Sequence, residues 1–268
     1  MKFSIGLIGA GNMGGALVKA AVKNGILQGD NLAILDVNAA AAQSLAEELR
    51  AHVADSYRTL VDKCNMLLIA VKPFSAQAVL DELAYYADTE KHSLLSIVTG
   101  LSTQQITEAT GLRCMRVMPN TPALIGQGMS VYSTAHTLDD LEFTFATDFF
   151  AAAGETEGIG EEYFSAVTAV SGSGPAYVYM FIEAFSDAAV QQGLPRAVSY
   201  KLAAQTVLGA AGMVLQTQTH PAVLKDAVCT PAGTTIQALA ALEQNGLRNA
   251  VYAAVQASAA RAKALEND

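Results

Sequence analysis

The first half of the chain alternates between two hydrophobic patterns. Short, nearly continuous apolar runs are typical of buried parallel strands, and stretches with apolar residues three or four apart are typical of helices. The expected strands are 3–8, 32–35, 66–71, 93–98, 114–118 and 129–132, and the expected helices are 16–23, 39–49, 74–85, 102–110 and 138–152. This alternation predicts an α/β fold with a doubly wound, mostly parallel sheet of the Rossmann type.

From about residue 161 the pattern is helical only, with helices expected at 161–170, 176–192, 195–216, 234–244 and 247–265. We therefore expect a Rossmann domain at 1–160 and an all-helical domain at 161–268. Two uncharged stretches, 164–182 and 202–224, are interrupted by Gly, Pro, Gln and Thr, so neither is a convincing membrane span. Helices that are apolar on nearly every side need a cover, and a subunit interface would provide it.

Composition narrows the possible partners. The net charge of the 268 residues is −9 and the sequence contains no run of Lys or Arg, which argues against nucleic acid and anionic membranes. Three cysteines without framework spacing favour a reducing, cytoplasmic setting. The four histidines lack metal-ligand spacing and are expected on the surface or in loops, and Glu161-Glu162 is expected to be a solvated helix start. We expect no metal site.

A glycine-rich turn follows the first strand and opens the first helix. Gly9 allows a tight turn, Gly11 lets the backbone approach a pyrophosphate, and Gly14 lets the helix pack on the strand. Asp36 ends the second strand, twenty-two residues after Gly14. This context predicts a dinucleotide site formed by Ile8, Gly9, Ala10, Gly11, Asn12, Met13, Gly14 and Asp36.

The sequence leaves the choice between NADP and NAD open. Asp36 would accept a hydrogen bond from a free ribose 2′-hydroxyl and repel a 2′-phosphate, which favours NADH. No Lys or Arg follows within Asp36-Val-Asn38, although Arg58 could reach in from another loop.

Two further segments leave the carboxyl ends of expected strands, where such sheets bind ligands. Ala70, Val71, Lys72 and Pro73 form the first, and they are expected beside the cofactor. Lys72 fits equally well as a solvated lysine before a helix-starting proline. In the second, Arg116–Pro122, two prolines stiffen the chain around Asn120, which we also assign to the cofactor site.

Thr230-Pro-Ala-Gly233 interrupts the helical pattern just before the segment that begins at Thr234. A Thr followed by Pro fits a helix start, and such an end offers free N–H groups to a carboxylate or phosphate. The hydroxyls of Thr234 and Thr235 stand where neighbouring atoms of a bound anion would be. The simpler alternative is a capped helix without a ligand.

Five motifs in this order resemble those of the pyrroline-5-carboxylate reductases, the enzymes that complete proline biosynthesis. They are Ile8-Gly-Ala-Gly-Asn-Met13, Ala70-Val-Lys-Pro73, Arg116-Val-Met-Pro-Asn-Thr-Pro122, Ser171-Gly-Ser-Gly-Pro-Ala-Tyr177 and Leu224-Lys-Asp-Ala-Val-Cys-Thr-Pro-Ala-Gly-Thr-Thr-Ile236. The resemblance implies reduction of a cyclic imine to L-proline with NADPH or NADH. It also implies a homodimer of interlocked helical domains, further assembly into rings, and an active site between the domains, built largely at the dimer interface.

The same resemblance suggests roles for particular residues. Thr230, Gly233 and Thr234 would hold the substrate carboxylate, and Thr235 would hydrogen-bond the ring nitrogen as the catalytic residue. Ser173, Gly174 and Pro175 would line the substrate cleft, although a kink between packed helices explains that segment equally well. The chain departs from the family at Ala232, where the family usually has glycine, so a positive φ there becomes doubtful.

Two other functions remain as alternatives. β-Hydroxyacid dehydrogenases share the plan but carry a catalytic lysine four residues past a comparable glycine, and counting from Gly174 that position is Val178. A non-catalytic dinucleotide-binding redox sensor would explain the first half of the chain, but it would not need the hydroxyl-rich loop at 230–235.

Overall fold

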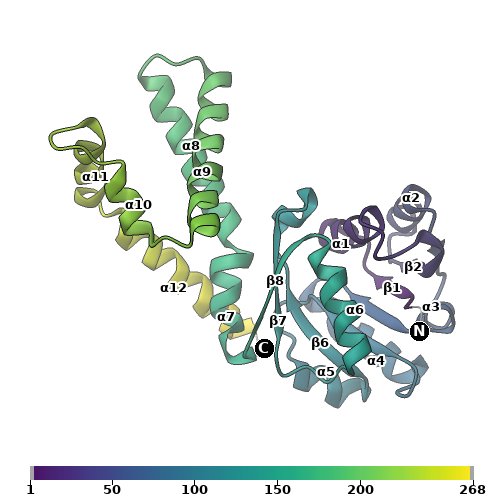
Figure 1. The fold of residues 1–268 in the computed structure, drawn as a ribbon. Coiled ribbons are helices and arrows are strands. Elements are labelled where there is room, and N and C mark those ends of the chain that lie inside the picture. The colour runs from purple at the N-terminus through teal and green to yellow at the C-terminus, as the bar shows by residue number, and fades with distance from the viewer. Residues whose placement is uncertain (1–2, 266–268) are drawn as a thin grey trace. The chain divides into compact units, whose positions relative to one another are not determined.

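The sheet is the organising element of the first half of the chain. A computed structural model describes residues 3–265 (Figure 1). Its strands are β1 (Ile5–Ile8), β2 (Leu32–Leu35), β3 (His52–Val53), β4 (Met66–Ile69), β5 (Ser93–Ser96), β6 (Arg113–Met118), β7 (Gly128–Ser133) and β8 (Gly154–Ile159). They form one eight-stranded sheet in the order β3-β2-β1-β4-β5-β6-β7-β8. Only the β6–β7 pair is antiparallel. The predicted Rossmann-type, mostly parallel sheet is confirmed.

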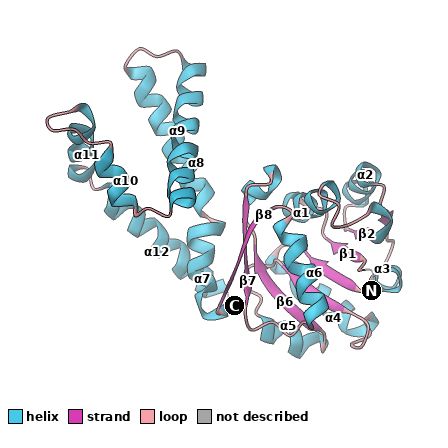
Figure 2. Cartoon of the chain, in the orientation of Figure 1, coloured by secondary structure: helices cyan, strands magenta, loops and turns pink. Residues whose placement is uncertain are grey.

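Helices cover both faces of this sheet (Figure 2). They are α1 (Asn12–Lys23), α2 (Ala39–Leu49), α3 (Tyr57–Lys63), α4 (Ala76–Tyr86), α5 (Thr103–Thr110) and α6 (Asp140–Ala151). Successive strand residues point to opposite faces. Leu7 and Leu68 pack with α1, α2 and α6, whereas Ile8 and Leu67 pack with α3, α4 and α5. This two-sided burial explains why the strands read as continuous apolar runs.

The hydrophobic pattern missed three elements of the first half: β3, α3 and β8. β3 is only two residues long, and α3 spans seven. β8 has the sequence Gly-Glu-Thr-Glu-Gly-Ile, and its pairing with β7 places Glu155 and Glu157 in exposed positions. Charged residues on an exposed edge strand are a common protection against aggregation, but they make a strand resemble a loop in the sequence.

The chain leaves β8 through a short helical segment. A 3₁₀ turn (Glu161–Tyr163) leads into α7 (Phe164–Val167), then into a π-helical stretch over Thr168–Gly172. The Ser173 N–H donates to the carbonyl of Thr168, five residues back, at 2.8 Å. The expected interruption at 171–175 is therefore a π-type bulge and not a break, and such bulges frequently occur at functional sites.

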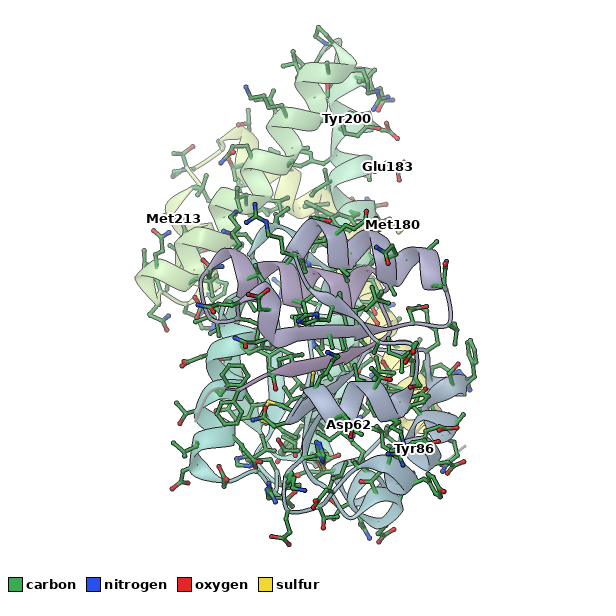
Figure 3. The ribbon with its side chains drawn as sticks, turned by 90° about the vertical axis from the view of Figure 1, so that its right-hand side faces the viewer. Asp62, Tyr86, Met180, Glu183, Tyr200 and Met213 are labelled. Atoms are coloured by element: carbon green, nitrogen blue, oxygen red, sulfur yellow. The ribbon has the colours of Figure 1, made fainter. Side chains whose placement is uncertain are left out.

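The remaining helices are α8 (Gly174–Gln191), α9 (Arg196–Thr217), α10 (Pro221–Ala227), α11 (Thr234–Gln244) and α12 (Leu247–Leu265). Within 174–257 only Ser186, Ser199 and Ala203 are buried. Met180, Tyr200 and Met213 project outward from α8 and α9 (Figure 3), with 45–74% of each residue exposed. These helices leave most of their apolar surface uncovered by the chain itself.

Residues 3–173 and 258–265 form one compact unit, and residues 174–257 form another. Residues 161–173, expected in the helical domain, lie in this first unit. Their helix packs on the sheet: Phe164 is fully buried, and the guanidinium of Arg116 lies 4.5 Å from its ring centroid.

Among the described residues, α9 alone is long and apolar enough to cross a membrane, with a mean hydropathy of 1.2. Length and composition are the whole basis of that match, and an apolar helix covered by another subunit would give the same pattern.

Candidate active site

The glycine-rich loop joins β1 to α1 at the carboxyl end of the sheet. Gly9 has a φ of +103°, and a Cβ there would lie 2.7 Å from the carbonyl oxygen of Ala70. A Cβ at Gly14 would lie 2.6 Å from the carbonyl oxygen of Gly9. Both positions therefore require glycine, the first for its backbone conformation as well as for space.

The first turn of α1 is open to an anion. Gly11 is the N-cap residue, no side chain caps its N–H groups, and a Cβ at Gly11 would meet nothing within 4 Å. Free N–H groups and the positive end of the helix dipole suit a pyrophosphate. Ala10, Gly11 and Asn12 border a groove of about 280 Å³ on this side of the loop. The residues present therefore fit a dinucleotide.

Asp36 follows the last residue of β2 and lies against this loop. The Ala10 N–H donates to its Oδ2 at 2.6 Å, and the Asn38 N–H donates to its Oδ1 at 2.7 Å. The guanidinium of Arg58 lies over the Tyr86 ring, 5.6 Å from its centroid. The carboxylate of Asp36 is thus fixed beside the loop, while the guanidinium of Arg58 is directed to an aromatic ring.

Residues 70–73 lie beside the loop at the end of β4. The Ala70 N–H donates to the carbonyl of Ile8 at 2.8 Å, so this segment and the end of β1 adjoin. Lys72 is exposed and precedes the 3₁₀ turn Pro73–Ser75. The carboxyl ends of neighbouring parallel strands thus bring together the glycine-rich loop, Asp36 and the 70–73 segment.

The side chain of Asn120 is occupied by contacts within the chain. Its Nδ2 donates to the carbonyl and hydroxyl oxygens of Ser171 at 3.2 and 3.3 Å, and its Oδ1 accepts from the Met129 N–H at 2.9 Å. Asn120 therefore ties the segment after β6 to the π-helical stretch. Next to that stretch, the hydroxyls of Ser173 and Ser258 lie 3.0 Å apart.

The sequence pattern missed the partial burial of Glu161, which was expected to be solvated together with Glu162; Glu161 is half-buried, whereas Glu162 is exposed as expected. Its Oε1 accepts from the Thr103 N–H at 2.9 Å and from Arg116 at 3.0 Å, and its Oε2 accepts from the Ser133 hydroxyl at 3.0 Å. Burial acts to raise the pKa of Glu161, but the hydrogen bonds from Thr103 and the ion pair with Arg116 outweigh it and hold the pKa below its usual value. The expectation failed because partners this distant in the chain leave no local pattern.

His92 was expected on the surface or in a loop; it lies in the loop just before β5, and its side chain is buried. Its Nε2 lies 3.0 Å from the carbonyl of Val61, and its Nδ1 accepts from the Asp88 N–H at 2.9 Å. No group of three potential metal-binding side chains occurs among the described residues.

The loop before α11 is a tight turn. The Gly233 N–H donates to the Thr230 carbonyl at 3.0 Å, Pro231 and Ala232 occupy the two central positions, and Ala232 has a φ of +58°. A positive φ at the second central position is typical of a type II turn. The Thr-Pro pattern had indicated that Thr230 caps the helix, and this expectation was wrong. The N-cap residue is Gly233.

No side chain caps the start of α11. A Cβ at Gly233 would lie 2.3 Å from the Thr230 hydroxyl oxygen, so that hydroxyl lies directly over the helix start. Thr234 and Thr235 are the first two residues of α11. The start of α11 thus offers uncapped N–H groups to an anion, and Thr230, Thr234 and Thr235 carry hydroxyls within three residues of its N-cap.

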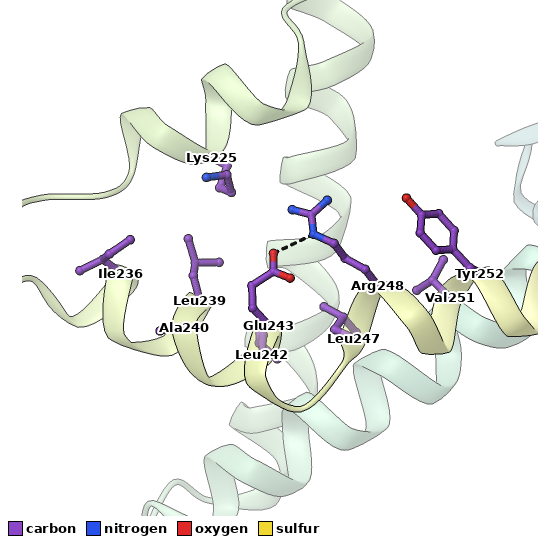
Figure 4. Close-up of a pocket in the computed structure, with 10 residues that line it drawn as sticks. All are labelled: Lys225, Ile236, Leu239, Ala240, Leu242, Glu243, Leu247, Arg248, Val251 and Tyr252. Carbon is purple, nitrogen blue, oxygen red and sulfur yellow. Dashed lines mark hydrogen bonds and ion pairs between the residues drawn. The ribbon is translucent and has the colours of Figure 1, made fainter.

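An apolar groove of about 590 Å³ lies between α10, α11 and α12 (Figure 4). Ile236 and Leu239 point from α11 toward the side of Lys225, and Glu243 Oε1 accepts from Arg248 Nε at 2.7 Å. The lining residues are Lys225, Ile236, Leu239, Ala240, Leu242, Glu243, Leu247, Arg248, Val251 and Tyr252. The groove lies on the helical surface that the chain leaves uncovered.

Relatives match over nearly the whole chain. Pyrroline-5-carboxylate reductase of Escherichia coli is 39% identical over 258 residues, 95% of each chain, and that of Methanosarcina acetivorans is 39% identical over 263 residues, 97% of each. The chain belongs to the pyrroline-5-carboxylate reductase family. A family model described as pyrroline-5-carboxylate reductase dimerisation matches residues 161–265, and one described as NADP oxidoreductase, coenzyme F420-dependent, matches residues 4–100.

Solved reductases of the family share the fold. A Plasmodium falciparum pyrroline carboxylate reductase with NADP bound has a TM-score of 0.87 at 32% identity, covering 99% of both chains. A Coxiella burnetii pyrroline-5-carboxylate reductase has a TM-score of 0.90 at 31% identity, also covering 99% of both chains. They confirm the expected fold class: a Rossmann-type domain followed by the helical dimerisation domain of the reductase family.

Proposed function

We propose that the protein reduces 1-pyrroline-5-carboxylate to L-proline with NADPH or NADH, the last step of proline biosynthesis. Membership of the reductase family along nearly the whole chain carries this proposal. The presence of Val178 where a β-hydroxyacid dehydrogenase would need lysine supports it over that alternative.

The cofactor part rests on the loop after β1. Residues 8–14, Asp36, Ala70–Pro73 and Asn120 form the proposed dinucleotide site. The uncapped first turn of α1 supports binding of the pyrophosphate there. When bound, the reduced nicotinamide supplies the hydride. The amide of Asn120 is used within the chain, so its part is to hold the backbone after β6 in place.

The substrate part rests on the turn before α11. Its carboxylate binds at the uncapped start of this helix, near Thr230, Gly233 and Thr234. The hydroxyl of Thr235 hydrogen-bonds the ring nitrogen, and Ser173, Gly174 and Pro175 line the substrate. A protonated C=N bond is already electrophilic, so positioning and placed charge supply most of the rate, with little need for a general acid.

The helical unit supports assembly with further copies of the chain. Its exposed apolar helices need a cover, and the dimerisation family model matches the same region. We infer a homodimer that associates further into a ring. The three cysteines are free thiols, as a reducing compartment such as the cytoplasm would leave them.

The proposal is tested by steady-state oxidation of NADPH and NADH with 1-pyrroline-5-carboxylate. We expect turnover with at least one cofactor. Thr235→Ala should lower kcat at least about tenfold, because one hydrogen bond to the reacting ring is lost, while cofactor affinity stays unchanged. Thr144→Ala is the matched control, since this exposed hydroxyl bonds only the Asp140 carbonyl of its own helix.

One result would contradict the proposed activity, and another would contradict only the role of Thr235. Cofactor binding without oxidation in the presence of the imine would favour the redox-sensor alternative. Unchanged turnover in Thr235→Ala would remove Thr235 from the reaction while leaving the activity itself intact.

A further inference from the structure

The carboxyl end of β2 carries an anchored acidic group. Both carboxylate oxygens of Asp36 accept backbone N–H groups, Oδ2 from Ala10 at 2.6 Å and Oδ1 from Asn38 at 2.7 Å. These two bonds fix the carboxylate beside the glycine-rich loop. In a Rossmann fold the adenosine ribose of the dinucleotide lies at this position.

The segment after Asp36 offers no cation to a phosphate. Residues 37–49 contain neither lysine nor arginine. Val37 is fully exposed, and the Asn38 side chain caps α2 by accepting from the Ala41 N–H at 3.2 Å. The first turn of α2 consists of alanines.

Two basic side chains of neighbouring elements have partners of their own. Lys19 on α1 forms an ion pair with Glu48 on α2 at 2.7 Å. Arg58 on α3 stacks on Tyr86. A 2′-phosphate would therefore face the carboxylate of Asp36 without a cation beside it in the 36–38 segment.

We infer that the protein uses NADH in preference to NADPH, with Asp36 as the residue that determines this specificity. The inference rests on the cofactor part of the proposed function. A carboxylate accepts hydrogen bonds from the ribose 2′-hydroxyl of NADH, whereas it repels a 2′-phosphate. A relative of the same fold was solved with NADP bound, so the fold itself admits the phosphate and side chains must make the distinction.

The test compares the dissociation constants of NADH and NADPH for the full chain by fluorescence titration, without substrate. We expect NADH to bind at least about tenfold more tightly, because like charges brought together oppose binding. Raising the salt concentration should bring the dissociation constants of NADH and NADPH closer together, because salt screens the repulsion between Asp36 and the 2′-phosphate. Equal affinities, or tighter binding of NADPH, would overturn the inference. Because binding needs no imine, a protein that prefers NADH but does not reduce the imine would refute the proposed function alone.

Two variants locate the determinant. Asp36→Asn should bring the two dissociation constants closer together. An unchanged ratio of these constants would show that Asp36 does not determine the cofactor preference. Val37→Arg keeps Asp36 and its bonds to the loop, and it should strengthen NADPH binding by placing a cation at an exposed neighbouring position. Asp62→Asn is the matched control: it makes the same charge change at an exposed site on α3 (Figure 3) and should leave the ratio unaltered.

Discussion

Ala232 stands where the resemblance to the family would place a glycine, and it adopts the left-handed conformation that glycine favours. It adopts a φ of +58° in the turn closed by Gly233 N–H and the Thr230 carbonyl. A left-handed conformation costs an L-residue roughly 1 kcal/mol, whereas glycine adopts it freely. The turn therefore forms with alanine, but with strain that glycine would relieve.

Ala232→Gly should stabilise the protein by about 0.5 kcal/mol, since relief of strain exceeds the entropy that glycine adds to the unfolded chain. Ala84→Gly, in an exposed position of α4, is the control and should destabilise by about 1 kcal/mol, because its backbone is right-handed. Thermal unfolding at one protein concentration measures both changes. A lower melting temperature for Ala232→Gly would show that the turn is not strained.

At the scale of elements, Glu161 joins the end of β8 to α5, β6 and β7. It accepts from Thr103, Arg116 and Ser133, and only 3% of the Arg116 side chain is exposed. Removing one partner of a largely buried ion pair is destabilising, because the remaining charge keeps its desolvation cost and loses the attraction of that partner. Glu161 therefore fixes the point where the chain leaves the sheet for α7.

Glu161→Gln should destabilise the protein by about 2–3 kcal/mol, measured by urea unfolding at neutral pH. The pKa of Glu161 is lowered in the folded protein, so its stabilisation is present above the ordinary value of about 4.3 and is lost as the pH falls through the folded pKa. The variant should lack this part of the acid dependence. Glu155→Gln, on exposed β8, is the control and should leave both stability and acid dependence near those of the original protein. An equal loss of unfolding free energy in Glu161→Gln and Glu155→Gln would contradict the stabilising role of the Glu161–Arg116 ion pair.

At the scale of the whole molecule, residues 174–257 do not form a core of their own. Only three of their residues are buried, while aromatic and aliphatic side chains of α8, α9, α11 and α12 stay exposed. Burial of such surface is the main favourable term in association, so a second copy of the chain stabilises this unit.

Leu242→Asp should therefore weaken subunit association by about 3 kcal/mol, or about a hundredfold, because it would bury an unpaired carboxylate. Leu242 lines the groove on α11 and is 41% exposed in the single chain. The matched control is Leu141→Asp on α6, where the leucine is 63% exposed and belongs to the first unit. Sedimentation equilibrium measures the assembly of each variant. An unaltered oligomer in Leu242→Asp would exclude this groove from the interface.

The local pattern of apolar and turn residues was sufficient to predict many of the helices and strands. The expected bounds of β2, α2, α11 and α12 agree with the structure, because apolar spacing and turn residues act between near neighbours in the chain. The same reasoning missed β8, whose glutamates face solvent, and it read the π-helical stretch as a break. Both depend on neighbouring elements that the local sequence does not specify.

The order of residues alone specifies the α/β alternation, the glycine-rich turn with Asp36 after the next strand, the motifs of the reductase family and helices with more apolar surface than one chain buries. Which groups meet depends on the tertiary structure. It paired Glu161 with Arg116, forty-five residues away, bound Asp36 to the N–H of Ala10, and left the helices of 174–257 uncovered. Periodicity records the face of an element that is buried, whereas the partner on that face is set by packing between distant segments.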